Sequence, residues 1–253
     1  MIPKIIHYVW LGGNTFPNIV KKCIDSWKKI CSDYEIKEWN ENNFDITSNL
    51  YCKQAYEKKM WAFSSDYIRL AVLYNYGGIY LDTDVEIFKT FDNFLNKPAF
   101  IGFNSPDLLD TGTIGAEKNN FWVKQMLKYY DVSPFINFDG SFNVGTNNFF
   151  ITYWTKLLNP NFELASSEYH LKHISVYPQN HISLIDKIPD GYNENNNAYA
   201  IHYGTKSWVP VDYNIKEKKW QKFIKEYKKK EIDRIVRIGI KLFHMKIDKA
   251  LLM

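Results

Sequence analysis

The sequence has no long apolar run and few cysteines. No stretch approaches the ~18 apolar residues that a membrane-spanning helix needs, so we expect no segment that crosses a bilayer. Cys23, Cys31 and Cys52 form no C-x-x-C pair, which disfavours a zinc site or a disulfide framework and predicts reduced thiols in a cytoplasmic protein. The N-terminal MIPKIIHYVWLGG lacks a small-residue cleavage site, and it is typical of a buried first strand and not of a signal peptide.

Several common catalytic and nucleotide-binding motifs are also absent. The sequence contains no G-x-G-x-x-G, no P-loop and no G-x-S-x-G, and its cysteines sit in no nucleophile signature. It carries no signature of an RNA- or DNA-binding module either, and most of the chain is mildly acidic, so we expect no nucleic-acid partner.

Charge divides the chain into two parts. Residues 214–253 hold 13 Lys and Arg against 5 Asp and Glu, whereas residues 1–213 hold 19 against 23. The chain is 45% hydrophobic, which is enough for one large core. We therefore predict one domain over 1–213 and a basic amphipathic helical tail over 214–253 that contacts an anionic membrane. The alternative, a tail helix packed on the domain with a solvated basic face, stays open.

Hydrophobic spacing in the domain predicts alternating strands and helices. The expected strands are 5–11, 34–39, 79–81, 99–103 and 199–203, and the expected helices are 17–30, 119–130, 149–158 and one that begins at Ser64 or Ser65 and ends at Gly77-Gly78. Strand, helix, strand at the start of a chain is typical of an α/β sheet. Residues 186–197 are polar and predict a loop.

Two carboxylates follow the short apolar strand at 79–81. Asp82 and Asp84 flank Thr83, and open α/β sheets bind their ligands at the carboxyl ends of strands. Mn²⁺ or Mg²⁺ commonly binds one or two such carboxylates together with substrate phosphates. The pattern favours a metal and nucleotide-diphosphate site, although a D-x-D pair also occurs by chance in solvated turns.

Polar residues on the preceding helix and at the first strand could complete this site. Asp66 and Arg69 lie three residues apart among apolar neighbours, so they share a helix face and could bind sugar hydroxyls. An ordinary surface ion pair is the alternative. Trp10 ends the first strand next to Gly12-Gly13 and could stack on a nucleobase or pack in the core.

A second constellation, HYGTKSW, follows the late strand. An imidazole at His202 would complete a Mn²⁺ site with the two carboxylates. Gly204 allows close backbone approach, Lys206 offers a charge for phosphate, and Trp208 could cover the donor from the other side. His7 and the other histidines lack such company and are predicted to be structural or surface residues. Residues 110–122 and 143–148 are rich in Gly and Asn, which predicts either acceptor-binding loops or simple turns.

Three segments together carry a family resemblance. IPKIIHYVWLGG, SDYIRLAVLYNYGGIYLDTD and IHYGTKSW occur in this order within residues 1–213. They resemble the sugar-binding DXD glycosyltransferases of family 32, which include capsule and lipopolysaccharide sugar transferases and yeast-type initiating mannosyltransferases. The chain is also similar to the glucosyltransferase domain of the large clostridial toxins, although these carry a carboxylate where this chain has His202.

The resemblance implies a GT-A fold, with a mixed and mostly parallel sheet flanked by helices. It implies that Trp10 stacks on the base, that Asp66 and Arg69 hold the donor sugar with Tyr80 beside it, and that Asp82 and Asp84 lie at the metal. HYGTKSW resembles the closing motif of family 8 galactosyltransferases, in which the His binds Mn²⁺ and Gly and Lys contact the diphosphate. Here the spacing is one residue tighter at two points and Ser207 replaces a proline.

The predicted function is transfer of a hexose from a nucleotide-diphosphate sugar to a glycan or lipid-linked acceptor in capsule or lipopolysaccharide synthesis, and the resemblance implies that configuration is retained. Asp66, Arg69, Asp82 and Asp84 are the expected catalytic residues, UDP the favoured nucleotide with GDP its competitor, and the inner face of the cell membrane the expected location. A toxin-like effector that glycosylates a protein and a non-catalytic sugar-nucleotide binder remain the alternatives.

Overall fold

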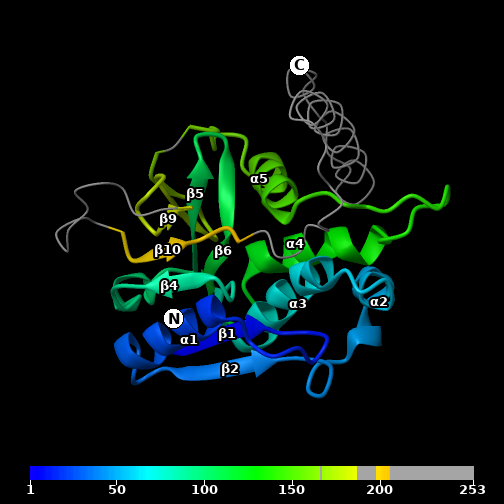
Figure 1. The fold of residues 1–253 in the computed structure, drawn as a ribbon. Coiled ribbons are helices and arrows are strands. Elements are labelled where there is room, and N and C mark those ends of the chain that lie inside the picture. The colour runs from blue at the N-terminus through cyan, green and yellow to red at the C-terminus, as the bar shows by residue number, and fades with distance from the viewer. Residues whose placement is uncertain (166, 187–197, 206–253) are drawn as a thin grey trace.

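Helices and two sheets account for most of the chain that the structure describes. The computed structural model describes residues 1–165, 167–186 and 198–205, and Figure 1 shows their arrangement. The helical elements are α1 (Asn18–Ile30), η1 (Ile46–Ser48), α2 (Leu50–Glu57), α3 (Trp61–Tyr76), η2 (Asp92–Phe94), α4 (Phe121–Val132) and α5 (Asn147–Leu158). The strands are β1 (Ile5–Val9), β2 (Glu35–Trp39), β3 (Gly78–Leu81), β4 (Val85–Ile87), β5 (Ala99–Ser105), β6 (Leu108–Ala116), β7 (Tyr169–His170), β8 (Ser175–Tyr177), β9 (Ser183–Ile185) and β10 (Ala200–His202).

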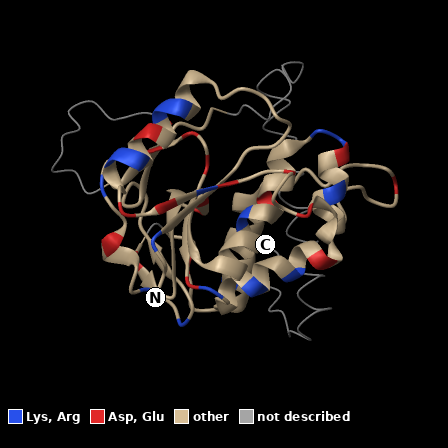
Figure 2. Cartoon of the chain, turned by 90° about the horizontal axis from the view of Figure 1, so that it is seen from below, with Lys and Arg blue, Asp and Glu red and all other residues tan. Residues whose placement is uncertain are grey.

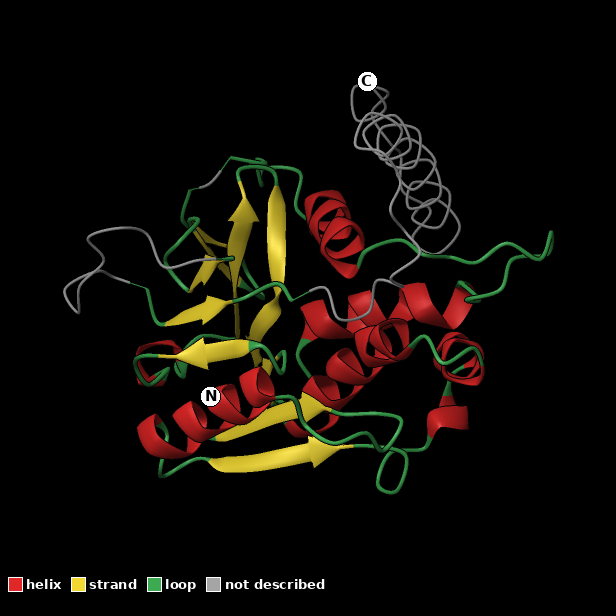
Figure 3. Ribbon diagram, in the orientation of Figure 1, coloured by secondary structure: helices red, strands yellow, loops and turns green. Residues whose placement is uncertain are grey.

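The larger sheet is mixed, with most strands running in one direction. Its order is β2-β1-β3-β6-β5-β8-β7. Strands β2, β1, β3, β5 and β8 are parallel in direction, whereas β6 and β7 run opposite to them. A smaller sheet has the order β4-β10-β9. Helices flank the larger sheet (Figure 3), which confirms the predicted α/β class with a mixed, mostly parallel central sheet.

Apolar side chains cover both faces of this sheet. On β3, Ile79 and Leu81 pack in a core with α1, whereas Tyr80 belongs to the core formed with α2 to α5. A strand that is buried on both faces reads as a continuous apolar run, which is why this short segment could be recognised from the sequence. Cys23, Cys31 and Cys52 are buried and unpaired.

The helix before the D-x-D segment begins earlier than the sequence predicts. α3 starts at Trp61, and Ser64 is buried and donates its hydroxyl to the Cys52 carbonyl instead of capping the helix. Its end is as expected, because Gly77 adopts φ +69 and its amide bonds to the Leu73 carbonyl. A Cβ at this glycine would lie 2.7 Å from the backbone nitrogen of Lys118, so a side chain is excluded there.

The largest error of the sequence interpretation concerns residues 110–122. Most of this segment is strand β6, which is hydrogen-bonded between β3 and β5 in the centre of the sheet, and residues 121–122 begin α4. It is therefore not an acceptor-binding loop. The predicted loop at 186–197 and the predicted tail at 214–253 lie outside the described residues, apart from Asp186.

Acidic and basic residues are interspersed over the described part of the molecule. Figure 2 shows Lys, Arg, Asp and Glu distributed among the helices and loops without a large region of one sign in that part of the chain. None of the helices among the described residues is long and apolar enough to cross a membrane.

Candidate active site

Asp82 and Asp84 lie where the chain passes from the larger sheet to the smaller one. The Asp82 amide still donates to the Gly112 carbonyl on β6, at 2.8 Å, and the Val85 amide then closes a turn onto the Asp82 carbonyl. β4 begins at Val85 and pairs with β10, where His202 is opposite Val85. The pairing of two short strands thus brings an imidazole from the end of the domain to the two carboxylates.

These three side chains form a cluster of oxygen and nitrogen ligands. One ligand atom from each of Asp82, Asp84 and His202 lies within 4.8 Å of the others. His202 Nε2 is 3.4 Å from Asp84 Oδ1 and 3.8 Å from Asp82 Oδ2. All three side chains are partly accessible to solvent. Two carboxylates and one imidazole suit Mn²⁺, and their spacing is compatible with a cation between them.

The charges around this cluster favour a cation. Burial would lower the pKa of His202, but Asp110, Asp84 and Asp82 surround it and raise this pKa well above its usual value. Burial likewise would raise the pKa of Asp84, but the hydrogen bonds and charge of His202 and two donors from Thr205 hold it well below its usual range. A bound divalent cation would supply the positive charge that the protonated imidazole otherwise provides.

Two outer contacts of the cluster were not predicted from the sequence. Asp110 Oδ1 lies 3.1 Å from His202 Nδ1, and the amide and hydroxyl of Thr205 each donate to Asp84 Oδ2 at 2.8 Å. Asp110 was missed because its strand was interpreted as a loop. Thr205 lies within the HYGTKSW segment, which could have drawn attention to it.

Arg69 connects the α3 helix to the carboxylates. Its Nη2 is 2.9 Å from Asp66 Oδ1 and 3.3 Å from Asp82 Oδ1, and its Nη1 donates to the Thr111 carbonyl at 2.7 Å. Its guanidinium lies over the Tyr80 ring, 4.7 Å from the centroid, and the Tyr80 hydroxyl donates to Asp82 Oδ1 at 3.0 Å. The predicted pair is therefore a buried network that reaches the D-x-D segment, not a surface ion pair.

The start of α5 borders this network. Asn147 Nδ2 donates to Asp66 Oδ1 at 3.2 Å, and Thr111 Oγ1 donates to Asn148 Oδ1 at 3.1 Å. Burial raises the pKa of Asp66, and the positive charge of Arg69 only partly opposes this effect. The 143–148 segment thus lies beside predicted donor-sugar residues, and its role in acceptor binding stays a prediction.

Trp10 lies at the same edge of the sheet as the carboxylates but belongs to a different strand end. Trp10 follows β1, which is parallel and adjacent to β3, so it lies at the same sheet edge as Asp82. Its ring contacts Phe16 edge-on, with 5.0 Å between the ring centroids, and its Nε1 donates to the Asn14 carbonyl.

The HYGTKSW segment is described only in part. A Cβ at Gly204 would lie 2.7 Å from Asp186 Oδ1, so close packing explains why glycine occupies this position. Lys206 and Trp208 lie outside the described residues.

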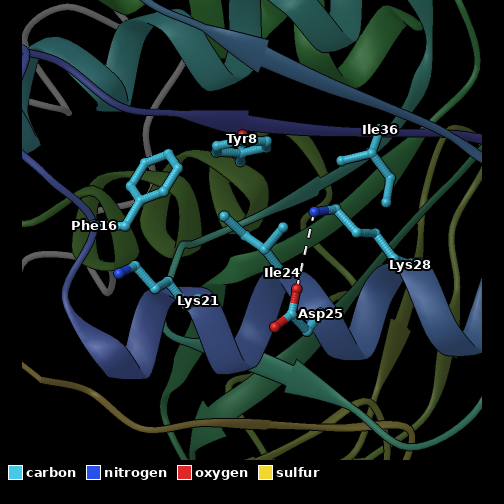
Figure 4. A pocket seen from close by; sticks show the side chains of 7 residues that line it. All are labelled: Tyr8, Phe16, Lys21, Ile24, Asp25, Lys28 and Ile36. Carbon is cyan, nitrogen blue, oxygen red and sulfur yellow. Dashed lines mark ion pairs between the residues drawn. The ribbon is translucent and has the colours of Figure 1, made fainter.

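A separate groove opens between α1 and the β1–β2 edge. It has a volume of about 330 Å³ and is lined by Tyr8, Phe16, Lys21, Ile24, Asp25, Lys28 and Ile36. Figure 4 shows the Asp25–Lys28 ion pair among these lining side chains. None of the predicted site residues lines this groove, so it is not the candidate active site.

Comparison with known proteins shows a similarity over the segment that contains the two carboxylates. Residues 17–101 match the model of the glycosyltransferase sugar-binding region containing a DXD motif, and Asp82 and Asp84 lie inside the matched segment. Over this segment the chain is similar to the DXD glycosyltransferases. This result confirms the family resemblance and the predicted enzyme class.

The proteins that this chain resembles include named glycosyltransferases. Inositol phosphoceramide mannosyltransferase 3 of Schizosaccharomyces pombe is 32% identical over 135 residues, 50% of this chain and 36% of that protein. An uncharacterized glycosyltransferase of Acanthamoeba polyphaga mimivirus is 28% identical over 235 residues, 83% of this chain and 85% of that protein. The chain thus spans little more than a third of the first relative. A solved glycosyltransferase involved in glycosylation of the major capsid of PBCV-1 is 14% identical with a TM-score of 0.46, covering 80% of this chain and 95% of that one.

Proposed function

We propose that this protein moves a hexose from a nucleotide-diphosphate sugar to a glycan or lipid-linked acceptor. One divalent cation, Mn²⁺ or Mg²⁺, would be held by Asp82, Asp84 and His202. The observation that carries the proposal is the approach of these three ligand groups to within 4.8 Å of one another. The pairing of β4 with β10 supports it, because this pairing places His202 next to the segment that carries the two carboxylates.

Donor binding is assigned to the residues around the D-x-D segment. Asp66 and Arg69 would hold the sugar hydroxyls, with Tyr80 beside the sugar and Asp82 between ribose, sugar and metal. Trp10, at the same sheet edge, would stack on the base. The contacts of Arg69 with both carboxylates support this assignment, because they fix the guanidinium in one position before the donor arrives. Gly204, Lys206 and Trp208 would close over the diphosphate and the base.

The proposed reaction exchanges one bond at the anomeric carbon. The bond between C1 of the hexose and the diphosphate oxygen breaks, and the acceptor hydroxyl oxygen bonds to C1 on the same face. The hydroxyl proton passes to the leaving phosphate oxygen, so configuration is retained without an enzyme nucleophile. When bound, the divalent cation neutralises negative charge that develops on the leaving diphosphate. Arg69 would stabilise the sugar as it acquires oxocarbenium character by holding its hydroxyls in place.

The donor and acceptor are proposed by class. UDP-hexose is the favoured donor on the basis of the family resemblance. GDP-hexose is the competitor, because the names of two relatives refer to transfer of mannose, which makes mannose a candidate sugar. The name of the Schizosaccharomyces pombe relative refers to a ceramide lipid, which supports a lipid-linked acceptor. We place the reaction in synthesis of a surface polysaccharide, capsule or lipopolysaccharide, on the cytoplasmic face of the membrane.

The basic segment 214–253 would hold the enzyme at that face. Its 13 basic residues against 5 acidic ones favour binding to anionic lipid. Flotation with phosphatidylglycerol vesicles tests this role by comparing the full chain with a chain that ends at residue 213. Loss of flotation on truncation is expected, and equal flotation of both chains would contradict membrane targeting by the tail.

Release of nucleoside diphosphate from nucleotide sugars tests the proposed function. With Mn²⁺, we expect slow hydrolysis of UDP-hexose or GDP-hexose by the wild type and by Asp107→Asn, a matched control in the turn before β6. We expect Asp84→Asn to be at least ~100-fold slower, since a lost charge-stabilising contact typically costs this much. Hydrolysis that survives both Asp84→Asn and EDTA would refute the metal role, and donor binding without any hydrolysis or transfer would identify a binder.

A further inference from the structure

Asp110 is a buried carboxylate that no predicted role accounts for. It lies on β6 in the centre of the larger sheet and is 2% exposed. Its Oδ1 accepts the Gly112 amide at 3.0 Å and lies 3.1 Å from His202 Nδ1, while its Oδ2 is buried without a hydrogen-bond partner. Burying an ionised carboxylate is costly unless it is paired. The contact with His202 offsets this cost, and the question is what the contact does for the imidazole.

The two nitrogens of the His202 ring face different groups. Nδ1 faces Asp110, whereas Nε2 faces Asp84 Oδ1 at 3.4 Å and Asp82 Oδ2 at 3.8 Å. A neutral imidazole carries its proton on one nitrogen and offers a lone pair on the other. A proton on Nδ1, donated to Asp110, leaves the Nε2 lone pair directed at the space between the two carboxylates.

Gly112 allows this arrangement to form. A Cβ at this position would lie 2.5 Å from His202 Nδ1, 2.6 Å from Cε1 and 3.2 Å from Asp110 Oδ1. Any larger residue would therefore force the imidazole away from the carboxylate. Asp110 and Gly112 are two residues apart on β6, so they lie on the same face of the strand and both contact the ring from that face.

We propose that Asp110 is a positioning residue for the cation site. This inference rests on the proposed function. It accepts the Nδ1–H of His202 and thereby holds the ring so that Nε2 can bind a divalent cation together with Asp82 and Asp84. Metal-bound histidines commonly donate their second N–H to a carboxylate, which fixes the ring and raises its basicity. Asp110 itself does not reach substrate, because it is buried on the opposite side of the ring.

Manganese affinity without substrate tests this proposal. Free Mn²⁺ is measured by electron paramagnetic resonance in titrations of the wild type, Asp110→Asn, His202→Gln and the double variant, with Asp107→Asn as the matched control. Loss of a carboxylate behind a metal-bound histidine typically weakens affinity 10- to 100-fold, and we expect this for Asp110→Asn. In the His202→Gln background, Asp110→Asn should change affinity by less than about twofold, because Asp110 acts through this ring.

Two results of the titration would overturn the proposal. One is an unchanged affinity in Asp110→Asn, and the other is the same loss in the presence and absence of His202, which would indicate a general structural effect. Asp84→Asn distinguishes failure of the positioning role of Asp110 from failure of the metal site itself. Mn²⁺ binding that depends on Asp84 but not on Asp110 refutes only this inference, whereas binding that is absent or independent of Asp84 refutes the proposed metal site and the inference together.

A measurement on the unaltered protein removes any question of folding. With Zn²⁺ as a diamagnetic probe, two-bond proton–nitrogen spectra of ¹⁵N-histidine-labelled protein report which ring nitrogen carries the proton. We expect a protonated Nδ1 and a metal-bound Nε2 for the signal that disappears in His202→Gln. The opposite tautomer would overturn the proposal.

Discussion

Replacing Arg69 by methionine removes the guanidinium that joins α3 to the D-x-D segment. Arg69 is 5% exposed and contacts Asp66 and Asp82 at 2.9 and 3.3 Å. Loss of one partner from a buried ion pair typically destabilises a protein by about 3–5 kcal/mol, because the other charge stays buried without compensation. For a domain of this size, we expect a Tm lower by roughly 6–20 °C.

Urea unfolding of matched variants tests this value. Lys53→Met removes an exposed ion pair with Glu57, whose charged atoms are 3.9 Å apart, and it should change stability by less than about 1 kcal/mol. Asp66→Asn combined with Arg69→Met should recover part of the lost stability, since it removes one uncompensated carboxylate. A loss below about 1 kcal/mol in Arg69→Met would refute the view that this network is buried and coupled.

Two further predictions concern the sheet. His7 is buried between the Gly77 carbonyl and Trp39, and burial lowers its pKa from 6.5 to about 4. The folded protein therefore binds this proton less readily than the unfolded chain does. About 3 kcal/mol of stability that is present above pH 6.5 is lost as pH falls to 4. Urea unfolding between pH 4.5 and 7 should show a shallower pH dependence in His7→Gln but not in the exposed control His170→Gln, and equal slopes would contradict this. Gly115→Ala places a Cβ 2.0 Å from the Phe100 ring and should cost about 1–3 kcal/mol, with less than additive loss when combined with Phe100→Leu; full additivity would show that the two residues do not collide.

Local sequence was sufficient to locate the carboxylate pair but not its surroundings. Asp82 and Asp84 follow a strand that is apolar because both of its faces are buried, and this pattern is visible in a few consecutive residues. The approach of His202 depends on β10 pairing with β4 across more than a hundred residues. No local pattern encodes such a pairing, and family resemblance supplied it.

The glycines of β6 explain why this strand was missed. Gly112 and Gly115 resemble turn residues in the sequence, yet each accommodates a ring from another element, His202 in one case and Phe100 in the other. Tertiary packing explains why glycine occupies these two positions, and the intrinsic propensity of glycine does not reveal such packing. Because the strand was taken for a loop, Asp110 could not be recognised as a partner of the imidazole.

The central claim is that one divalent cation is held by Asp82, Asp84 and His202. Electron spin-echo modulation of bound Mn²⁺ tests it most directly, since a coordinated imidazole produces a ¹⁴N coupling. We predict one such coupling in the wild type, its loss in His202→Gln, and weaker Mn²⁺ binding in Asp84→Asn. Bound Mn²⁺ without a nitrogen coupling, or with a coupling that persists in His202→Gln, would contradict the account.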